Sequence, residues 1–182
     1  FVYRERRKPV IVAVDGLATA GGCEIVLAAD LVVATTRSSF GLAEVKRNLI
    51  AGAGGLFRLP RAIGQAAAME AILTGEPIPA ARAYELGLIS RLVEPGTAVQ
   101  EAMALAGKIT EAAPLAVWAS RKVVLAAAYI PGVAHLEQAQ KLRRRFFKFM
   151  SKRNVAEADM GRSGFVSTHW DAERYHRVSG PM

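Results

Sequence analysis

Apolar residues in the first part of the chain fall into short runs separated by turn residues. Residues 9–14 (PVIVAV) and 31–35 (LVVAT) are rich in β-branched side chains and are bounded by residues typical of turns. Short bounded runs of this kind predict buried strands. Between them, residues 21–29 predict a helix whose sides are all apolar, so we expect this helix to lie inside the protein.

A strand, a helix and a strand in succession form a crossover unit. This arrangement predicts an α/β fold with a parallel or mixed sheet and helices packed against it. We expect a short third strand within residues 38–45 and a last strand at residues 88–94. From residue 97 onward the pattern is helical. Helices are predicted at residues 56–63, 65–73, 79–86, 97–112, 114–128 and 132–150.

One charged side chain, Glu24, interrupts the small and apolar residues of the first predicted helix. An ionised group removed from water costs several kcal/mol unless it is paired, hydrogen-bonded or used. One interpretation is that Glu24 caps the N-terminus of its own helix, where acidic residues are favoured. The other is catalysis. The unpaired N–H groups at Gly21 and Gly22 could receive a substrate oxygen that gains negative charge, with Glu24 one turn further along.

A second carboxylate, Glu44, also follows small and apolar residues and lies twenty positions after Glu24. Lys46 and Arg47 offer an alternative, in which Glu44 belongs to a surface ion pair. If the fold brings Glu24 and Glu44 together, the two carboxylates resist ionising at the same time, so that one stays protonated near neutral pH. An acid beside a base is what the addition of water to a double bond requires.

Other features have weaker functional interpretations. The glycine-rich residues 51–55 (AGAGG) lack one glycine of a dinucleotide fingerprint, so we interpret them as a structural turn or a close-approach loop. The basic residues within 141–153 predict a solvated helix face rather than a nucleic-acid interface. Residue types of a hydrolytic triad (Ser163, His169, Asp171) or a metal site (His169, Asp171, His176) occur without motif spacing, so we expect neither.

Composition and charge limit the number of domains, the compartment and the classes of partner that the chain can have. The chain has 182 residues, enough for one domain, and its single cysteine, Cys23, suits a reducing compartment such as the cytoplasm. The net charge of +8 is compatible with nucleic acid, phosphate-bearing cofactors and anionic membranes, and charge alone does not choose between them. No segment approaches the roughly 18 apolar residues of a membrane span, and the apolar run before Asp15 is too short for a secretory signal. Because it starts at Phe1 beside a predicted strand, we expect the chain to come from a longer protein.

Three stretches together resemble the crotonase superfamily, also called the enoyl-CoA hydratase/isomerase family. They are KPVIVAVDGLATAGGCEIVLAADLVVA, SSFGLAEVKRNLIAGAGGLFRLPRAIG and AMEAILTGEPIPAARAYELGLISRLVE, in the family order and spacing. The resemblance is close over residues 8–95 and continues in helical character to residue 150. It implies a crotonase-like (ClpP/crotonase) core of ββα units, truncated on its N-terminal side, with a C-terminal helical region.

The resemblance also implies a site. Glu24 and Glu44 match the two catalytic acidic residues of the hydratases, and Gly21 matches a donor of one of two backbone N–H bonds to the acyl-thioester oxygen. Gly22 and Gly52 are further candidates for oxyanion and substrate binding. The implied activity is reversible hydration of a trans-2-enoyl-CoA to a 3-hydroxyacyl-CoA, in fatty-acid or related acyl-CoA metabolism. No metal or separate cofactor is implied, because CoA is part of the substrate.

Domain organisation and the alternative functions follow from the same resemblance. Residues 1–95 are expected to form the α/β core, residues 96–159 a helical oligomerisation region and residues 160–182 an atypical tail. Similar proteins assemble as homotrimers or dimers of trimers. The other oxyanion donor and part of the CoA site belong to an N-terminal family region without a counterpart here. The alternatives are therefore Δ3,Δ2-enoyl-CoA isomerisation, which needs one acid–base group, and a non-catalytic CoA-binding remnant.

Overall fold

The computed structural model describes residue 2 and residues 6–127. The chain divides into two compact units, Phe1–Glu111 and Ala112–Met182. Several sequence-based expectations lie outside the described residues: the helix at 132–150, the basic run at 141–153, the tail at 160–182, and the triad and metal candidates Ser163, His169, Asp171 and His176.

The first unit contains two small sheets of three strands each. In sheet A the strands are all parallel, and in sheet B one pair is parallel and the other antiparallel. The strands of sheet A are, in spatial order, β1 (Ile11–Val14), β3 (Leu31–Thr35) and β6 (Arg91–Val93). Those of sheet B are β2 (Leu17–Thr19), β4 (Ser39–Gly41) and β5 (Ile78–Pro79).

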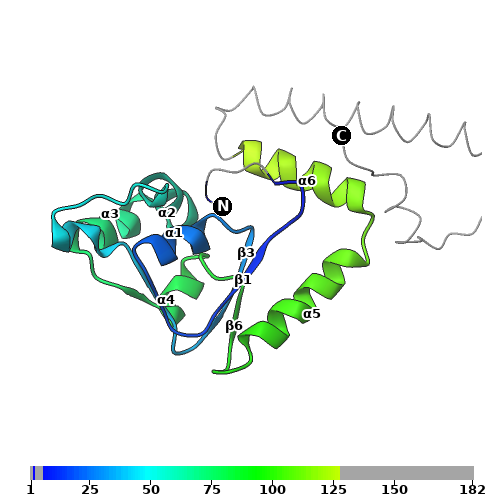
Figure 1. The fold of residues 1–182 in the computed structure, drawn as a ribbon, viewed down its shortest axis with the longest axis horizontal. Helices are drawn as coiled ribbons and strands as arrows, with labels where there is room; N and C mark the ends of the chain where they lie inside the picture. Colours follow the sequence, from blue (N-terminus) through cyan, green and yellow to red (C-terminus); the bar gives the residue numbers. More distant parts are fainter. Residues whose placement is uncertain (1, 3–5, 128–182) are drawn as a thin grey trace, which may run out of the picture. The chain divides into compact units, whose positions relative to one another are not determined.

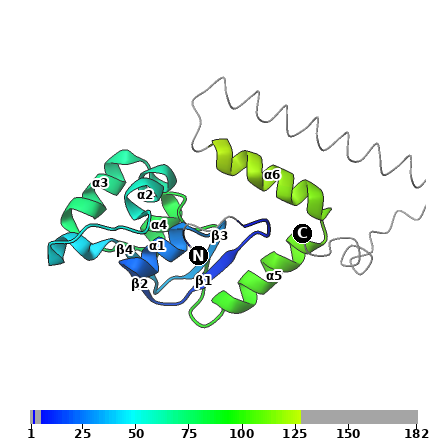
Figure 2. The same ribbon diagram turned by 45° about the horizontal axis from the view of Figure 1, so that its top comes forward.

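Helices cover both faces of sheet A. The strands of this sheet lie between α5 and the group formed by α1 to α4 in both Figure 1 and Figure 2. No helix in the described part of the chain is long and apolar enough to cross a membrane. The helices of the first unit are α1 (Gly21–Leu27), the 3₁₀ helix η1 (Ala43–Arg47), α2 (Gly55–Ile63), α3 (Gln65–Thr74), α4 (Ala80–Glu85) and α5 (Ala98–Thr110); α6 (Pro114–Ala127) belongs to the second unit.

The core of the first unit forms around β3, the central strand of sheet A. Val33, at the middle of this strand, is fully buried, because β1 and β6 flank it and helices cover both faces. Phe40 on β4, Leu42 before η1 and Leu59 on α2 are buried in the same unit. Each such side chain contributes about 1.5–3 kcal/mol through burial. This packing fixes the ends of β4, α1 and α2, where the candidate site lies.

Most of the sequence-based elements are confirmed. The strand at residues 31–35 is β3, and the parallel crossover connects it to β1. The sequence pattern missed β2 and β5, because runs of three and two residues carry no periodic signal. The expectation that the first helix is buried on every side is wrong: the Ile25 side chain is 50% exposed. α1 packs against β2 and α2, and among the described residues its remaining side is open.

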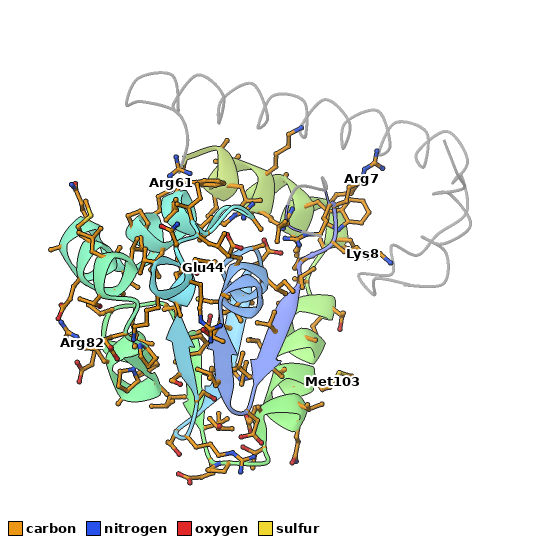
Figure 3. The ribbon with its side chains drawn as sticks, turned by 60° about the vertical axis from the view of Figure 1, so that its left-hand side comes forward. Arg7, Lys8, Glu44, Arg61, Arg82 and Met103 are labelled. Carbon is orange, nitrogen blue, oxygen red and sulfur yellow. The ribbon has the colours of Figure 1, made fainter. Side chains whose placement is uncertain are left out.

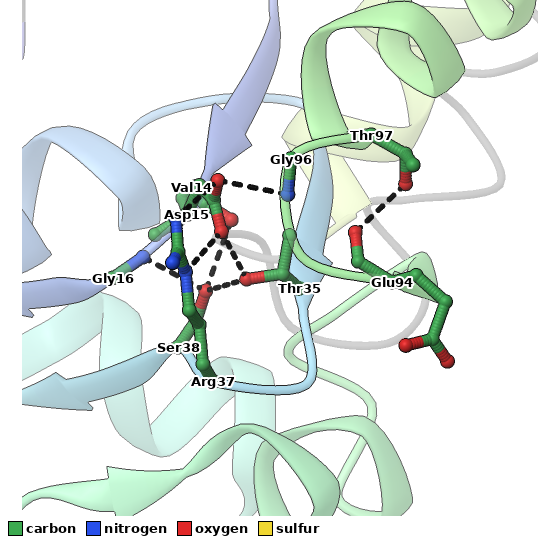
Figure 4. Close-up of polar contacts among 9 residues, drawn as sticks. All are labelled: Val14, Asp15, Gly16, Thr35, Arg37, Ser38, Glu94, Gly96 and Thr97. Carbon is green, nitrogen blue, oxygen red and sulfur yellow. Dashed lines mark hydrogen bonds and ion pairs between the residues drawn. The ribbon is translucent and has the colours of Figure 1, made fainter.

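A polar cluster joins the ends of β1 and β3 to the loop before α5 (Figure 4). The Asp15 carboxylate accepts hydrogen bonds from Nε and Nη2 of Arg37 (2.8 Å each), Thr35 Oγ1 (2.7 Å) and the Gly96 N–H (3.0 Å). Arg37 and then Thr35 contribute most to lowering the pKa of Asp15 to about 2. The N–H of Gly16, the residue after Asp15, donates a hydrogen bond to Ser38 Oγ (3.2 Å). The cluster fixes the turn that leads into β2 and then α1.

Candidate active site

Ala20 connects β2 to α1 in a strained conformation, with φ 51° and ψ −127°. Its N–H donates to the Gly41 carbonyl (2.8 Å), and its carbonyl accepts from the Glu24 N–H (3.0 Å). A positive φ in a residue other than glycine costs of order 1–3 kcal/mol and persists only where the surroundings hold it. These two bonds hold Ala20 and fix the point at which α1 begins.

Gly21 and Gly22 open α1, and both are exposed. Neither has a positive φ, and an added Cβ at either would meet nothing within 4 Å among the described residues. The described fold therefore does not itself require glycine at these positions. Their N–H groups find no acceptor in the described part of the chain. Gly52 is likewise exposed, with open space beside its Cα. Unpaired N–H groups at a helix start suit an oxygen that carries negative charge.

Glu24 lies one turn into α1, and its side chain is buried, with the residue 4% exposed. Its Oε1 accepts hydrogen bonds from the N–H groups of Ala53 (2.7 Å) and Gly55 (2.9 Å). Gly55 is the first residue of α2, and the preceding Gly54 has no side chain to cap that helix. Glu24 therefore caps a neighbouring helix rather than its own. The two N–H groups and the dipole of α2 offset the cost of burying the carboxylate.

The glycine-rich residues 51–55 form a close-approach loop. A Cβ added at Gly55 would lie 2.8 Å from Leu42 Cδ1 and 3.2 Å from Glu24 Cγ, which real Cβ atoms do not tolerate without movement. Glycine at this position therefore lets α1 approach the start of α2 closely enough for the hydrogen bonds to Glu24. Gly54, with φ 105°, adopts the left-handed conformation that favours glycine.

Glu44, on η1, directs one carboxylate oxygen inward. Its Oε2 is buried and has no hydrogen-bond partner among the described residues. Glu44 forms an ion pair with neither Lys46 nor Arg47 in the described part of the chain, and Lys46 Nζ donates instead to Glu76 Oε1 (2.6 Å). Figure 3 shows Glu44 among the helices, whereas Arg82 and Met103 point outward. A buried oxygen without a partner calls for an explanation, and a bound ligand at this position would supply the missing partner.

Cys23 precedes Glu24 on α1 and is buried. Burial raises the pKa of its thiol to about 12, and the negative charges of Glu44 and Glu24 add to the effect. The contacts around Gly55 place the start of η1 near Glu24: a Cβ built on Gly55 lies 2.8 Å from Leu42 Cδ1 and 3.2 Å from Glu24 Cγ, and Leu42 comes two residues before Glu44. The arrangement offers one carboxylate held by backbone donors and one with a buried free oxygen. Such a pair can accept and donate protons on a bound molecule.

Sequence reasoning missed the partners of Glu24. Ala53 and Gly55 act through their backbone N–H groups, 29 and 31 positions from Glu24, and a main-chain donor has no side-chain signature. The available signal was the glycine pair directly before the helix predicted at residue 56. Glycines at a helix start allow close approach to its free N–H groups.

The chain is similar to curated proteins that are named as acyl-CoA hydratases. The model of the family described as enoyl-CoA hydratase/isomerase matches residues 3–171. An (E)-benzylidenesuccinyl-CoA hydratase from Thauera aromatica is 48% identical over 118 residues, which cover 65% of this chain and 46% of that protein. A short-chain-enoyl-CoA hydratase from Clostridium acetobutylicum is 39% identical over 117 residues, which cover 64% of this chain and 45% of that protein. The chain thus spans about half the length of the curated relatives it matches.

Solved structures show the same relationship. An enoyl-CoA hydratase from Mycobacterium tuberculosis H37Rv has a TM-score of 0.78 and 45% identity, covering 92% of this chain and 68% of that one. An enoyl-CoA hydratase from Mycobacterium marinum has a TM-score of 0.78 and 43% identity, and the match covers 88% of this chain and 64% of that one. These similarities confirm the crotonase-like fold that the sequence motifs predict. Together with the match over residues 3–171, they show that the chain belongs to the enoyl-CoA hydratase/isomerase family.

Proposed function

We propose that the protein carrying this chain is an enoyl-CoA hydratase, a hydro-lyase that acts on acyl-CoA thioesters. It adds water reversibly across the C2=C3 bond of a trans-2-enoyl-CoA to give a 3-hydroxyacyl-CoA. The observation that carries the proposal is the pair of glutamates, one bonded to backbone N–H groups and one with a buried oxygen that has no partner among the described residues. Hydration requires one group to take a proton and another to give one.

In the proposed reaction, Glu24 and Glu44 hold one water between them. Glu24 takes a proton from this water while the water oxygen bonds to C3. Glu44 delivers a proton to C2, so that the elements of water are added across the double bond. The hydrogen bonds on Oε1 of Glu24 leave its other oxygen to engage the water. Because these two bonds hold the Glu24 carboxylate in one orientation, they support a defined position for the oxygen that takes the proton.

During the reaction a negative charge develops on the thioester oxygen. In our proposal the backbone N–H of Gly21 stabilises this charge by donating a hydrogen bond to the oxygen. Gly22 and Gly52 complete the proposed oxyanion and substrate-binding set. The open space at all three glycines supports this assignment, because a ligand can approach their backbone closely. One oxyanion donor contributes roughly 10²–10³ in rate.

Hydration of crotonyl-CoA tests the proposal, with Glu24→Gln and Glu44→Gln measured beside the wild type. The matched control is Glu85→Gln, which alters an exposed glutamate paired with Arg82. Each site variant is expected to lower kcat by roughly 10²–10⁴, the usual contribution of an acid–base group, whereas the control retains wild-type activity.

Two outcomes overturn the proposal. Isomerisation of an enoyl-CoA that survives Glu24→Gln identifies an isomerase, and a protein that binds CoA without turnover identifies a non-catalytic binder. Isomerisation is not favoured, because both carboxylates are present and the relatives described above are named hydratases.

We further infer a homotrimer or dimer of trimers that works in the cytoplasm. Leu49 and Ile50 are exposed and, with Val45 and Asn48, line a hollow of about 380 Å³. Exposed apolar side chains gathered in this way support an interaction surface. The free thiol of Cys23 supports a reducing compartment. Sedimentation equilibrium tests the assembly, and a monomer at micromolar concentration contradicts it.

A further inference from the structure

The loop that holds Glu24 is itself held by Arg58 of α2. Arg58 Nη1 donates to the carbonyl of Ala53 (2.9 Å), and the backbone N–H of Arg58 donates to the carbonyl of Gly54 (3.0 Å). The N–H of the same Ala53 donates to Glu24 Oε1 (2.7 Å). Ala53 therefore connects Arg58, through its carbonyl, with Glu24, through its N–H.

The guanidinium of Arg58 is fixed on several sides. Its Nη2 donates to the carbonyl of Val2 (2.6 Å), and its central carbon lies 4.9 Å from the centre of the Phe57 ring. A Cβ added at Gly54 would overlap Arg58 Nη1, so the side chain covers the loop directly. A planar guanidinium with donors in fixed directions suits this double contact, because it can hold two carbonyl groups at once.

We propose that Arg58 is a positioning residue for Glu24. By holding the carbonyl of Ala53, it keeps the turn at residues 53–55 in the conformation whose N–H groups fix the Glu24 carboxylate. The importance of this contact for catalysis rests on the hydration reaction proposed above. A displacement of about 1 Å in a catalytic group can cost up to roughly 10²-fold in rate, so loosening this turn has a measurable consequence.

Arg61 provides a matched control. It lies on the same helix, and its guanidinium is 5.4 Å from the centre of the same Phe57 ring. Arg61→Met removes a positive charge of the same kind from the same helix while Arg58 keeps its bond to Ala53. The pair of variants therefore separates the specific hydrogen bond from the general positive charge of α2.

The test combines hydrogen exchange at the amides of Ala53 and Gly55 with steady-state hydration of crotonyl-CoA. Arg58→Met is expected to speed exchange at both amides about tenfold or more, while the central strand β3 exchanges at the wild-type rate. It should lower kcat roughly 10- to 100-fold and change KM less than about twofold. Arg58→Lys, which keeps a cationic donor without the fork, should fall between, and Arg61→Met should match the wild type.

Three results would overturn the inference: unchanged exchange at Ala53 and Gly55 in Arg58→Met, an equal effect of Arg61→Met, or equally faster exchange throughout β3. The last would make Arg58 a stabiliser of the whole unit rather than of the loop. Because exchange needs no turnover, it decides the role of Arg58 even if the wild-type protein fails to hydrate crotonyl-CoA. The two proposals can therefore fail separately.

Discussion

Glu24 and Gly55 lie 31 positions apart in the chain, yet the Glu24 carboxylate accepts a 2.9 Å hydrogen bond from the Gly55 N–H. A side chain of α1 thereby satisfies the first N–H of α2. The proposed catalytic group is also a structural contact between two helices, so suitable substitutions should separate its two roles.

Substitutions of Glu24 provide the first such separation. Glu24→Gln keeps an oxygen that can accept from both Ala53 and Gly55, whereas Glu24→Leu leaves two N–H groups without an acceptor. We expect Glu24→Leu to lower the free energy of unfolding by about 2–4 kcal/mol and Glu24→Gln by less than about 1 kcal/mol, with hydration lost in both. Urea denaturation measures the difference. Equal stability of the two variants would contradict the structural role.

Gly55→Ala tests the close approach between α1 and α2. The new Cβ would be forced against Leu42 and the stem of Glu24, so we expect a loss of about 1–3 kcal/mol in the free energy of unfolding and reduced hydration. The control is Gly107→Ala on α5, where a Cβ meets nothing within 4 Å and should stabilise the helix by about 0.5–1 kcal/mol. Thermal and urea unfolding measure both. Opposite signs for the two variants are the expected result.

Gly22→Ala should preserve or raise the stability of the fold and weaken the reaction. Nothing in the described fold needs glycine there, and alanine is the better helix former, so the free energy of unfolding should stay constant or rise by up to about 1 kcal/mol. A methyl group in front of the proposed oxyanion donors should raise KM or lower kcat for crotonyl-CoA at least about tenfold. Undiminished activity would remove Gly22 from the proposed binding set.

The Asp15 cluster predicts a pH-dependent contribution to stability. The pKa of Asp15 is lowered from its ordinary value of 3.8 to about 2, mainly by Arg37, so the unfolded chain binds this proton more tightly than the folded one. The contribution is therefore present above about pH 4 and is lost as the pH falls through about 2. Asp15→Asn should destabilise the protein at pH 7, and the difference should shrink between pH 4 and pH 2. Urea titrations across that range would reveal a constant difference if the inference were wrong.

Cys23 should be unreactive in the folded protein. The thiolate is the nucleophile, and burial together with the charges of Glu44 and Glu24 raises the thiol pKa from 9.0 to about 12. At pH 8, alkylation by iodoacetamide should be at least about 100-fold slower in the native protein than in urea. Mass spectrometry of the alkylated chain measures both rates. Rapid native labelling would show that Cys23 is accessible.

The sequence by itself determined the elements whose signals are local. The β-branched run at residues 31–35 specified β3, and the helices predicted at 56–63, 65–73 and 97–112 correspond to α2, α3 and α5. A strand or helix of this kind depends mainly on its own side chains, so neighbouring residues carry the information. The family motifs also singled out Glu24 and Glu44 as the candidate acid–base pair.

Only the tertiary structure decided what holds those groups. Every residue except proline carries the same backbone N–H, so no sequence pattern shows that those of Ala53 and Gly55 meet Glu24. The position of Arg58 over the loop and the division of the described strands into two sheets likewise follow from the path of the chain. The sequence specifies which residues carry a carboxylate or a guanidinium. Which groups contact a buried carboxylate depends on the packing of segments that are distant in the chain.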